Sequence, residues 1–179
     1  MEFSQGAQGR DQELVALFTA TFTASEGASE GTLIGDLVRN QLSRTPAANL
    51  YVFIAEADGE VIGGAIFTRL TYDQDDRSVF VLGPVAVATE RQGQGIGRQL
   101  LIYALQALRE AGIDIAVTYG DPSYYSRVGF APVTEAFIPA PFKLQYPEGW
   151  LAQSLTETEI TPLKGAVHCV EAFNDPAFW

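Results

Sequence analysis

The chain has little sulfur and little positive charge. Its 179 residues include a single cysteine, Cys169, and a single histidine, His168. One cysteine cannot form an internal disulfide or a cysteine-rich zinc site, and no other metal-ligand pattern is present, so we expect no metal. No apolar run is long enough to span a bilayer, and residues 1–10 contain no signal-peptide core. We therefore expect a cytoplasmic protein.

The charge balance is strongly acidic. Asp and Glu number 22 against 11 Lys and Arg, which gives a formal net charge of −11. Such a chain is a poor candidate for binding nucleic acid or an anionic membrane surface. Acidity favours cationic partners such as amines, although it also serves solubility. A hydrophobic content of 47% indicates a folded globular protein with a sizeable core.

Residues 79–111 form the most informative stretch. Residues 79–87 are almost continuously apolar and β-branched, which is typical of a strand buried on both faces. Gly83 and Pro84 interrupt this strand, and because proline has no N–H to donate, they predict a bulge or a splay. A glycine-rich turn follows, and then an amphipathic helix that begins near Ile96 and ends at Gly112.

The turn at residues 91–97, RQGQGIG, has the chemistry of an anion site. Its three alternating glycines let a ligand approach the backbone without meeting a Cβ atom. The helix that follows leaves its first N–H groups unpaired at the positive end of its dipole, which favours a phosphate or pyrophosphate. Arg91 and Arg98 add positive charge. The alternative is a tight strand-to-helix connection without a ligand.

Spacing excludes two familiar phosphate motifs. A P-loop requires Gly-Lys-Ser/Thr, whereas Gly97 is followed by Arg98 and Gln99. A dinucleotide fingerprint that starts at Gly93 would need glycine at position 98. The remaining pattern is Gln/Arg-x-x-Gly-x-Gly/Ala, which Gln92, Gly95 and Gly97 satisfy.

This pattern resembles the signature of the GCN5-related N-acetyltransferases (GNAT family), in which the loop lies between a splayed strand and a long helix. The resemblance implies acetyl-coenzyme A as co-substrate, with its pyrophosphate held by the loop amides, and no metal. It implies the following coenzyme-binding residues: Val85, Ala86 and Val87 on the strand, and Gln92, Gly93, Gln94, Gly95, Ile96, Gly97 and Arg98 in the turn.

A second motif lies at residues 120–130, GDPSYYSRVGF. Asp121 can cap a short helix that Gly129 ends, or it can serve as an active-site carboxylate. The string resembles the acetyltransferase segment in which a tyrosine precedes a Gly-Phe pair by four residues. The resemblance implies that Tyr125 contacts the coenzyme near its sulfur and protonates the leaving thiolate. Tyr124 is a rival candidate, and a half-buried core aromatic is the structural alternative for Tyr125.

The same string resembles a bacterial branch of the family, the YhbS-like predicted acetyltransferases, which carry an extended C-terminal segment. The resemblance to the broad family covers about residues 11–135, and the resemblance to the branch covers nearly the whole chain. One departure is that the strand ending at Tyr119 lacks the asparagine that many relatives place there to contact the pantetheine arm.

The remaining patterns predict an α+β fold with a mixed sheet, splayed at its parallel pair and flanked by helices, which is the GNAT acyl-CoA N-acyltransferase fold. Residues 1–135 form the expected core, and residues 136–179 form a C-terminal extension that completes the same domain. Asp58 and Gly59 predict a two-residue hairpin. The expected helices are 11–24, with Asp11 as its cap, and 29–43; the expected strands are 50–57, 60–70, 79–87 and 113–119, with a charged turn at 72–77.

Several further segments allow two interpretations. Residues 25–32 either form a substrate wall or a solvated loop. Residues 164–173 predict a last strand that pairs beside strand 113–119 or exchanges between subunits. We expect His168 on that strand to lie in a core or at an interface, and Cys169 to be a small buried hydrophobe. The aromatic residues Tyr72, Phe142 and Trp150 either line an acceptor cleft or pack in the core.

Together these patterns predict an enzyme that moves the acetyl group of acetyl-CoA directly to an amine. The acceptor, a small molecule or a peptide, and the general base are not identified by the sequence. The chain is expected to act as a monomer or homodimer. The alternative is a non-catalytic module that senses acetyl-CoA; such a module would keep the loop but could lose Tyr125.

Overall fold

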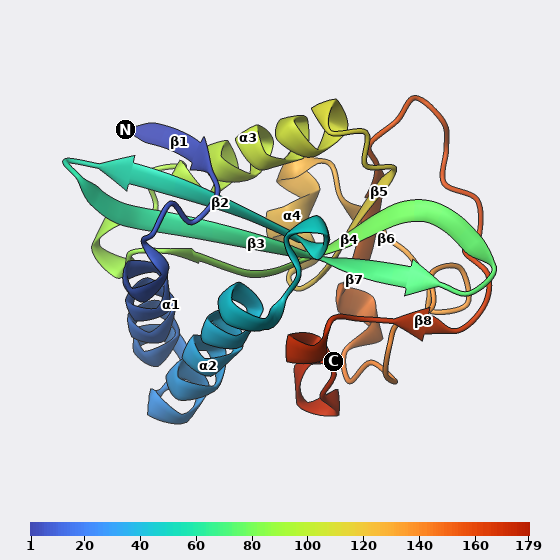
Figure 1. Cartoon of the computed structure of the whole chain (residues 1–179), viewed down its shortest axis with the longest axis horizontal. Helices are drawn as coiled ribbons and strands as arrows, with labels where there is room; N and C mark the ends of the chain where they lie inside the picture. The colour runs from blue at the N-terminus through green and yellow to red at the C-terminus, as the bar shows by residue number, and fades with distance from the viewer. The chain divides into compact units, whose positions relative to one another are not determined.

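The computed structural model describes all 179 residues and contains a mixed eight-stranded sheet with helices (Figure 1). The strand order is β1-β2-β3-β4-β5-β7-β6, and β8 pairs with β3. The predicted fold class is confirmed. The helices are α1 (Asp11–Glu26), α2 (Ala28–Arg44), α3 (Ile96–Glu110) and α4 (Pro122–Tyr125), and the strands are β1 (Glu2–Gln5), β2 (Leu50–Ala57), β3 (Glu60–Tyr72), β4 (Asp75–Val87), β5 (Ile115–Tyr119), β6 (Ala131–Pro132), β7 (Trp150–Ser154) and β8 (Val167–His168).

The chain divides into two compact units. The first comprises Met1–Phe67 and Pro84–Ala104, and the second comprises Thr68–Gly83 and Leu105–Trp179. The elements β3, β4 and α3 each contribute residues to both units. The predicted division at residue 135 into a core and an extension stays a prediction.

In the first unit, α1 and α3 cover opposite faces of β3. Successive residues of a strand point to opposite faces, and here the two central positions are glycines. A Cβ atom at Gly64 would lie 2.9 Å from Phe18 Cε2 of α1, whereas one at Gly63 would lie 3.5 Å from Leu100 Cδ2 of α3. The missing side chains therefore let both helices approach the strand closely.

The hairpin between β2 and β3 forms at Asp58 and Gly59, as predicted. Both residues have positive φ, 54° and 79°, as a type I′ turn requires. β1 extends this sheet by antiparallel pairing with β2, from Glu2 opposite Glu56 to Gln5 opposite Phe53.

The interpretation of residues 25–32 as a loop is wrong, because Gly27 alone separates α1 from α2. Its φ of 99° lets the chain reverse within one residue, so the flanking residues stay helical. Asp11 is also not the cap of α1: Arg10 occupies that position, without a side-chain capping bond, and Asp11 is the first helical residue. The two helices then pack against each other at Gly31 and Gly35 of α2, opposite threonines of α1.

In the second unit, β4 pairs in parallel with β5 over a short register, from Val79 opposite Ile115 to Leu82 opposite Thr118. The four β4 residues in this register are at most 2% exposed, which confirms the predicted burial on both faces for residues 79–82, whereas Val85 and Val87 further along are half-buried. Pairing with β5 stops directly before Gly83, where the interruption was predicted. The other neighbour of β5 is β7, so the prediction that residues 164–173 lie beside this strand is wrong.

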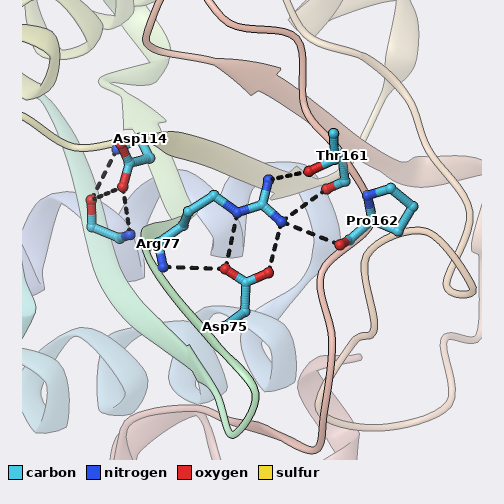
Figure 2. A network of polar contacts seen from close by, with 6 residues as sticks. Asp75, Arg77, Asp114, Thr161 and Pro162 are labelled. Atoms are coloured by element: carbon cyan, nitrogen blue, oxygen red, sulfur yellow. Dashed lines mark hydrogen bonds and ion pairs between the residues drawn. The ribbon is translucent and has the colours of Figure 1, made fainter.

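A polar network fastens the start of β4 to two other segments of the same unit (Figure 2). The Arg77 guanidinium donates to both carboxylate oxygens of Asp75, at 2.9 and 2.7 Å, and to the carbonyl oxygens of Thr161 and Pro162, at 3.0 and 3.2 Å. This pairing lowers the pKa of the Asp75 carboxyl. Next to it, the Asp114 carboxylate accepts from the backbone N–H of Ser78 at 2.8 Å and so ties β4 to the residues that enter β5.

The predicted last strand is much shorter than expected. Only Val167 and His168 enter the ladder, opposite Tyr72 and Thr71, because β3 ends there and a two-residue turn at Asp73 follows. The charged turn predicted over residues 72–77 is thus also shorter. His168 is not in a core, since its side chain is 60% exposed and bonds to Asp73 Oδ1 at 2.8 Å.

Two of the three aromatics considered for an acceptor cleft belong to the core of the second unit. Tyr72 is buried and its hydroxyl donates to the carbonyl of Pro139 at 2.7 Å. Trp150 is fully buried, its indole N–H donates to Ile138, and its ring packs against Trp179. The polar atoms of both side chains are hydrogen-bonded within the protein. Phe142 is half-buried, so for this residue alone both interpretations remain: an acceptor cleft or the core.

We expect Gly31→Ala to destabilise the protein by about 1–3 kcal/mol, because the added Cβ would lie 1.8 Å from Thr23 Oγ1 and 2.8 Å from the carbonyl oxygen of Thr19. The hydroxyl can rotate away, but the carbonyl belongs to the backbone of α1. Urea unfolding measures the change. The control is Thr32→Ala at the neighbouring exposed position, for which we expect a change within about 0.5 kcal/mol. A Gly31→Ala protein as stable as wild type would contradict this packing.

Candidate active site

The turn between β4 and α3 is an exposed loop of the first unit whose conformation depends on glycine. Gly93 and Gly95 have φ values of 75° and 78°, a region that strains other residues. Ile96 begins the helix and is buried, so it anchors the loop to the core. The first helical bond runs from the Gln99 N–H to the Gly95 carbonyl, at 3.1 Å.

The loop presents a row of unpaired amides. The backbone N–H groups of residues 93–98 have no acceptor within the chain, and all but two of these residues are exposed. They lie where the dipole of α3 is positive, so their partial charges add to that of the helix end. This arrangement is suited to an anion, and a pyrophosphate can accept several such bonds at once.

Gln92 holds the loop against the end of β4. Its side-chain amide donates to the Val87 carbonyl at 3.0 Å, and the Thr21 hydroxyl of α1 approaches the same carbonyl at 3.5 Å. The backbone N–H of Gln92 is itself bonded to Thr89, at 3.3 Å, so the available amides begin at Gly93. Gln92, the first residue of the predicted motif, therefore positions the loop in this structure.

The predicted strand residues adjoin this loop within the first unit. Ala86 is buried, whereas Val85 and Val87 are half-buried, in contrast to the fully buried residues before Gly83. Of the two arginines expected to add charge, Arg98 is exposed, and Arg91 lies 4.0 Å from the exposed carboxylate of Asp58. The structure thus brings the strand end and the loop together.

Tyr125 belongs to the second unit, at the end of α4. The Asp121 carboxylate accepts from the Ser123 N–H and hydroxyl at 2.9 and 2.8 Å, which confirms that it caps this helix. The same bonds lower the pKa of Asp121. Gly129, at φ 99°, ends the following turn, as predicted, and Phe130 is buried in the core.

Tyr125 is half-buried, and its ring packs against two neighbouring residues. It lies directly over Gly120, where a Cβ atom would be 2.7 Å from Cε2, and it packs edge-on against Phe130 with ring centroids 5.9 Å apart. Burial, with a smaller contribution from Tyr124, raises the pKa of Tyr125 to about 12, and a hydrogen bond with Thr118 opposes the shift. The phenol therefore keeps its proton at physiological pH.

Sequence reasoning missed two residues that position Tyr125. Gly120 gives the ring its seat, and the Thr118 hydroxyl, which donates to the Leu82 carbonyl at 3.1 Å, is its polar neighbour. The sequence signal that could have identified Gly120 is a glycine between the end of a strand and the Asp-Pro start of a helix.

The described chain contains no cluster of three metal-ligating side chains and no helix long and apolar enough to cross a membrane.

Comparisons with known proteins agree on one family. Residues 46–132 match the family model described as the acetyltransferase (GNAT) domain. The uncharacterized N-acetyltransferase YjhQ of Escherichia coli K12 is 32% identical over 141 residues, which cover 76% of this chain and 77% of YjhQ. The uncharacterized N-acetyltransferase YhbS of the same strain is 40% identical over 73 residues, covering 41% of this chain and 44% of YhbS.

Solved structures extend the similarity over nearly the whole chain. The crystal structure of Escherichia coli YhbS in complex with CoA superposes with a TM-score of 0.79 and 26% identity, covering 98% of this chain and 92% of YhbS. A GNAT acetyltransferase from Brucella melitensis in complex with acetyl-CoA gives a TM-score of 0.70 and 26% identity, covering 96% and 97%. With its glycine-rich loop, its splayed strand and these relatives, the chain belongs to the GNAT family of N-acetyltransferases.

Proposed function

We propose that this protein transfers the acetyl group of acetyl-CoA directly to an amine acceptor, a small molecule or a peptide. The observation that carries the proposal is the row of unpaired amides at residues 93–98, directly after a strand that has left its parallel neighbour. The two relatives crystallised with CoA and with acetyl-CoA support the choice of anion.

In this proposal the first unit holds the co-substrate. The amides of Gly93 to Arg98 bind the pyrophosphate, and Gln92 keeps the loop in place through its bond to the Val87 carbonyl. Residues 85–87 offer backbone groups to the pantetheine arm as a neighbouring strand would. A backbone N–H of this strand polarises the thioester carbonyl as charge develops on its oxygen.

Tyr125 supplies the proton for the leaving group. The amine nitrogen, in its neutral form, bonds to the carbonyl carbon, the carbon–sulfur bond breaks, and the sulfur takes the phenol proton. The proton lost from the nitrogen passes to water, and the phenol regains one from solvent. Because its pKa is about 12, Tyr125 is a weak acid that keeps its proton until the sulfur departs.

Direct transfer fits the thiol chemistry of the chain. The single cysteine, Cys169, is half-buried, and burial raises the pKa of its thiol, so little thiolate is present at neutral pH. An acyl-cysteine intermediate would need the opposite shift. A module that only senses acetyl-CoA would need the loop but not a phenol at the position of Tyr125, so this residue favours an enzyme.

We expect Gln94→Glu to weaken acetyl-CoA binding by tenfold or more, because it places a negative charge among the loop amides without requiring a positive φ. Titration calorimetry with acetyl-CoA measures the affinity. Gln12→Glu, on the exposed side of α1, makes the same change of net charge and should bind like wild type. Equal affinities for the two variants would place the coenzyme away from this loop.

We expect Tyr125→Phe to lower kcat about 10- to 100-fold while the KM for acetyl-CoA changes little, because the phenol acts on the leaving sulfur and not on the pyrophosphate. Release of free CoA thiol during turnover measures both constants. Tyr124→Phe is the matched control, since its ring contacts Tyr125 at a centroid distance of 5.0 Å and is more exposed. If Tyr124→Phe lost the activity and Tyr125→Phe kept it, the roles of the two tyrosines would be exchanged.

A further inference from the structure

The second unit contains a cavity of about 270 Å³ at the adjoining ends of β5 and β7. It is lined by Tyr119, Gly120, Pro122, Tyr146, Glu148 and Gly149. The volume lies just below the range of about 300–1,000 Å³ usual for ligand pockets, so its occupant is a small molecule or a single side chain.

The walls of this cavity are fixed by backbone contacts. The Gly120 N–H donates to the Gly149 carbonyl at 2.9 Å, and a Cβ atom at Gly149 would lie 2.9 Å from the Gly120 oxygen. The Tyr119 hydroxyl accepts the backbone N–H of Tyr146 at 2.6 Å. Close contact between Gly120 and Gly149, together with the hydrogen bond of Tyr119, therefore holds the segment before β7 against the end of β5.

The lining has the chemistry of a cation site. Glu148 is its only charged residue, it is exposed, and it forms no ion pair within the chain. Tyr119 and Tyr146 line the same cavity, and Tyr146 leaves 65% of its surface exposed. A carboxylate and aromatic rings in one cavity favour an alkylammonium group, which pairs with the charge and packs its methylenes on the rings.

The cavity and Tyr125 share one residue. Gly120 lines the cavity, and the Tyr125 ring packs against the same residue, with Cε2 2.7 Å from the position of a Cβ atom. The cavity and the phenol therefore meet at a residue that has no side chain.

We propose that this cavity binds the acceptor and that the acceptor is a small diamine, or an amine with a second cationic group, whose distal charge pairs with Glu148. This inference rests on the proposed acetyl transfer. The nitrogen that attacks must be neutral, and a carboxylate bound to it would hold it protonated. The partner of Glu148 is therefore the second, non-reacting cation, which makes Glu148 a specificity-determining residue.

The test compares 1,5-diaminopentane with 5-amino-1-pentanol, which share the reacting amine and differ only in the distal group. We expect the wild-type kcat/KM to favour the diamine about tenfold. Glu148→Gln should bring this ratio close to one, through a higher KM for the diamine and an unchanged kcat. Glu157→Gln removes the same charge from an exposed position of the same unit and should keep the wild-type ratio.

A ratio that is the same in wild type and Glu148→Gln would overturn the inference. If neither amine is acetylated, calorimetry with 1,5-diaminopentane decides it: binding to wild type that Glu148→Gln loses supports the cation site, and no binding overturns it. Calorimetry with acetyl-CoA, run on the same samples, tests the proposed transfer separately. Loss of acetyl-CoA binding would sink the enzyme assignment, whereas acetyl-CoA binding without diamine binding would sink only the acceptor site.

Discussion

The parallel pairing of β4 with β5 ends at Leu82 and Thr118, and much of the proposed chemistry depends on that ending. Pro84 has no N–H to offer a ladder, and it follows Gly83 directly. If the pairing continued, the backbone groups of residues 85–87 would be used within the sheet. In the proposed function the interruption leaves, for an extended ligand, the groups of this segment that β5 would have used. The Val87 carbonyl instead accepts from Gln92, which places the unpaired loop amides immediately beyond.

Each unit positions its own candidate residues with local contacts. The first unit provides amides held at a fixed geometry by two glycines of positive φ and one glutamine. The second unit provides a phenol whose place is set by Gly120, by Phe130 and by the cap at Asp121. In both units glycine leaves room for a close approach, by the proposed ligand in the first and by the Tyr125 ring in the second.

The features that sequence predicted well are those fixed by residues adjacent in the chain. The Asp58-Gly59 turn, the strand broken at Gly83 and the Asp121 cap each depend on the conformational preferences of two or three neighbouring residues. The spacing of the family motif located the glycine-rich loop in the same way, because it lies within one segment, while the role of Tyr125 stays a prediction.

The features that sequence predicted poorly depend on distant partners. Residues 164–173 are typical of a strand, but a strand needs a neighbour, and β3 offers only Thr71 and Tyr72 to it. The sequence does not show that the polar atoms of Trp150 and Tyr72 bond to the carbonyls of residues 138 and 139, which places both side chains in the core. No local pattern distinguishes the one-residue reversal at Gly27 from a loop.

The Arg77 network has a consequence for how the C-terminal half of the chain can change over evolution. Two of the three groups that the guanidinium holds at residues 161 and 162 are backbone carbonyls, which any amino acid supplies. The anchored segment is therefore free to drift in sequence provided that its path is kept. Arg77 itself is not free to change, because lysine lacks the planar guanidinium that bonds to Asp75 and these carbonyls at the same time. Related chains should accordingly vary at positions 161 and 162 far more than at position 77.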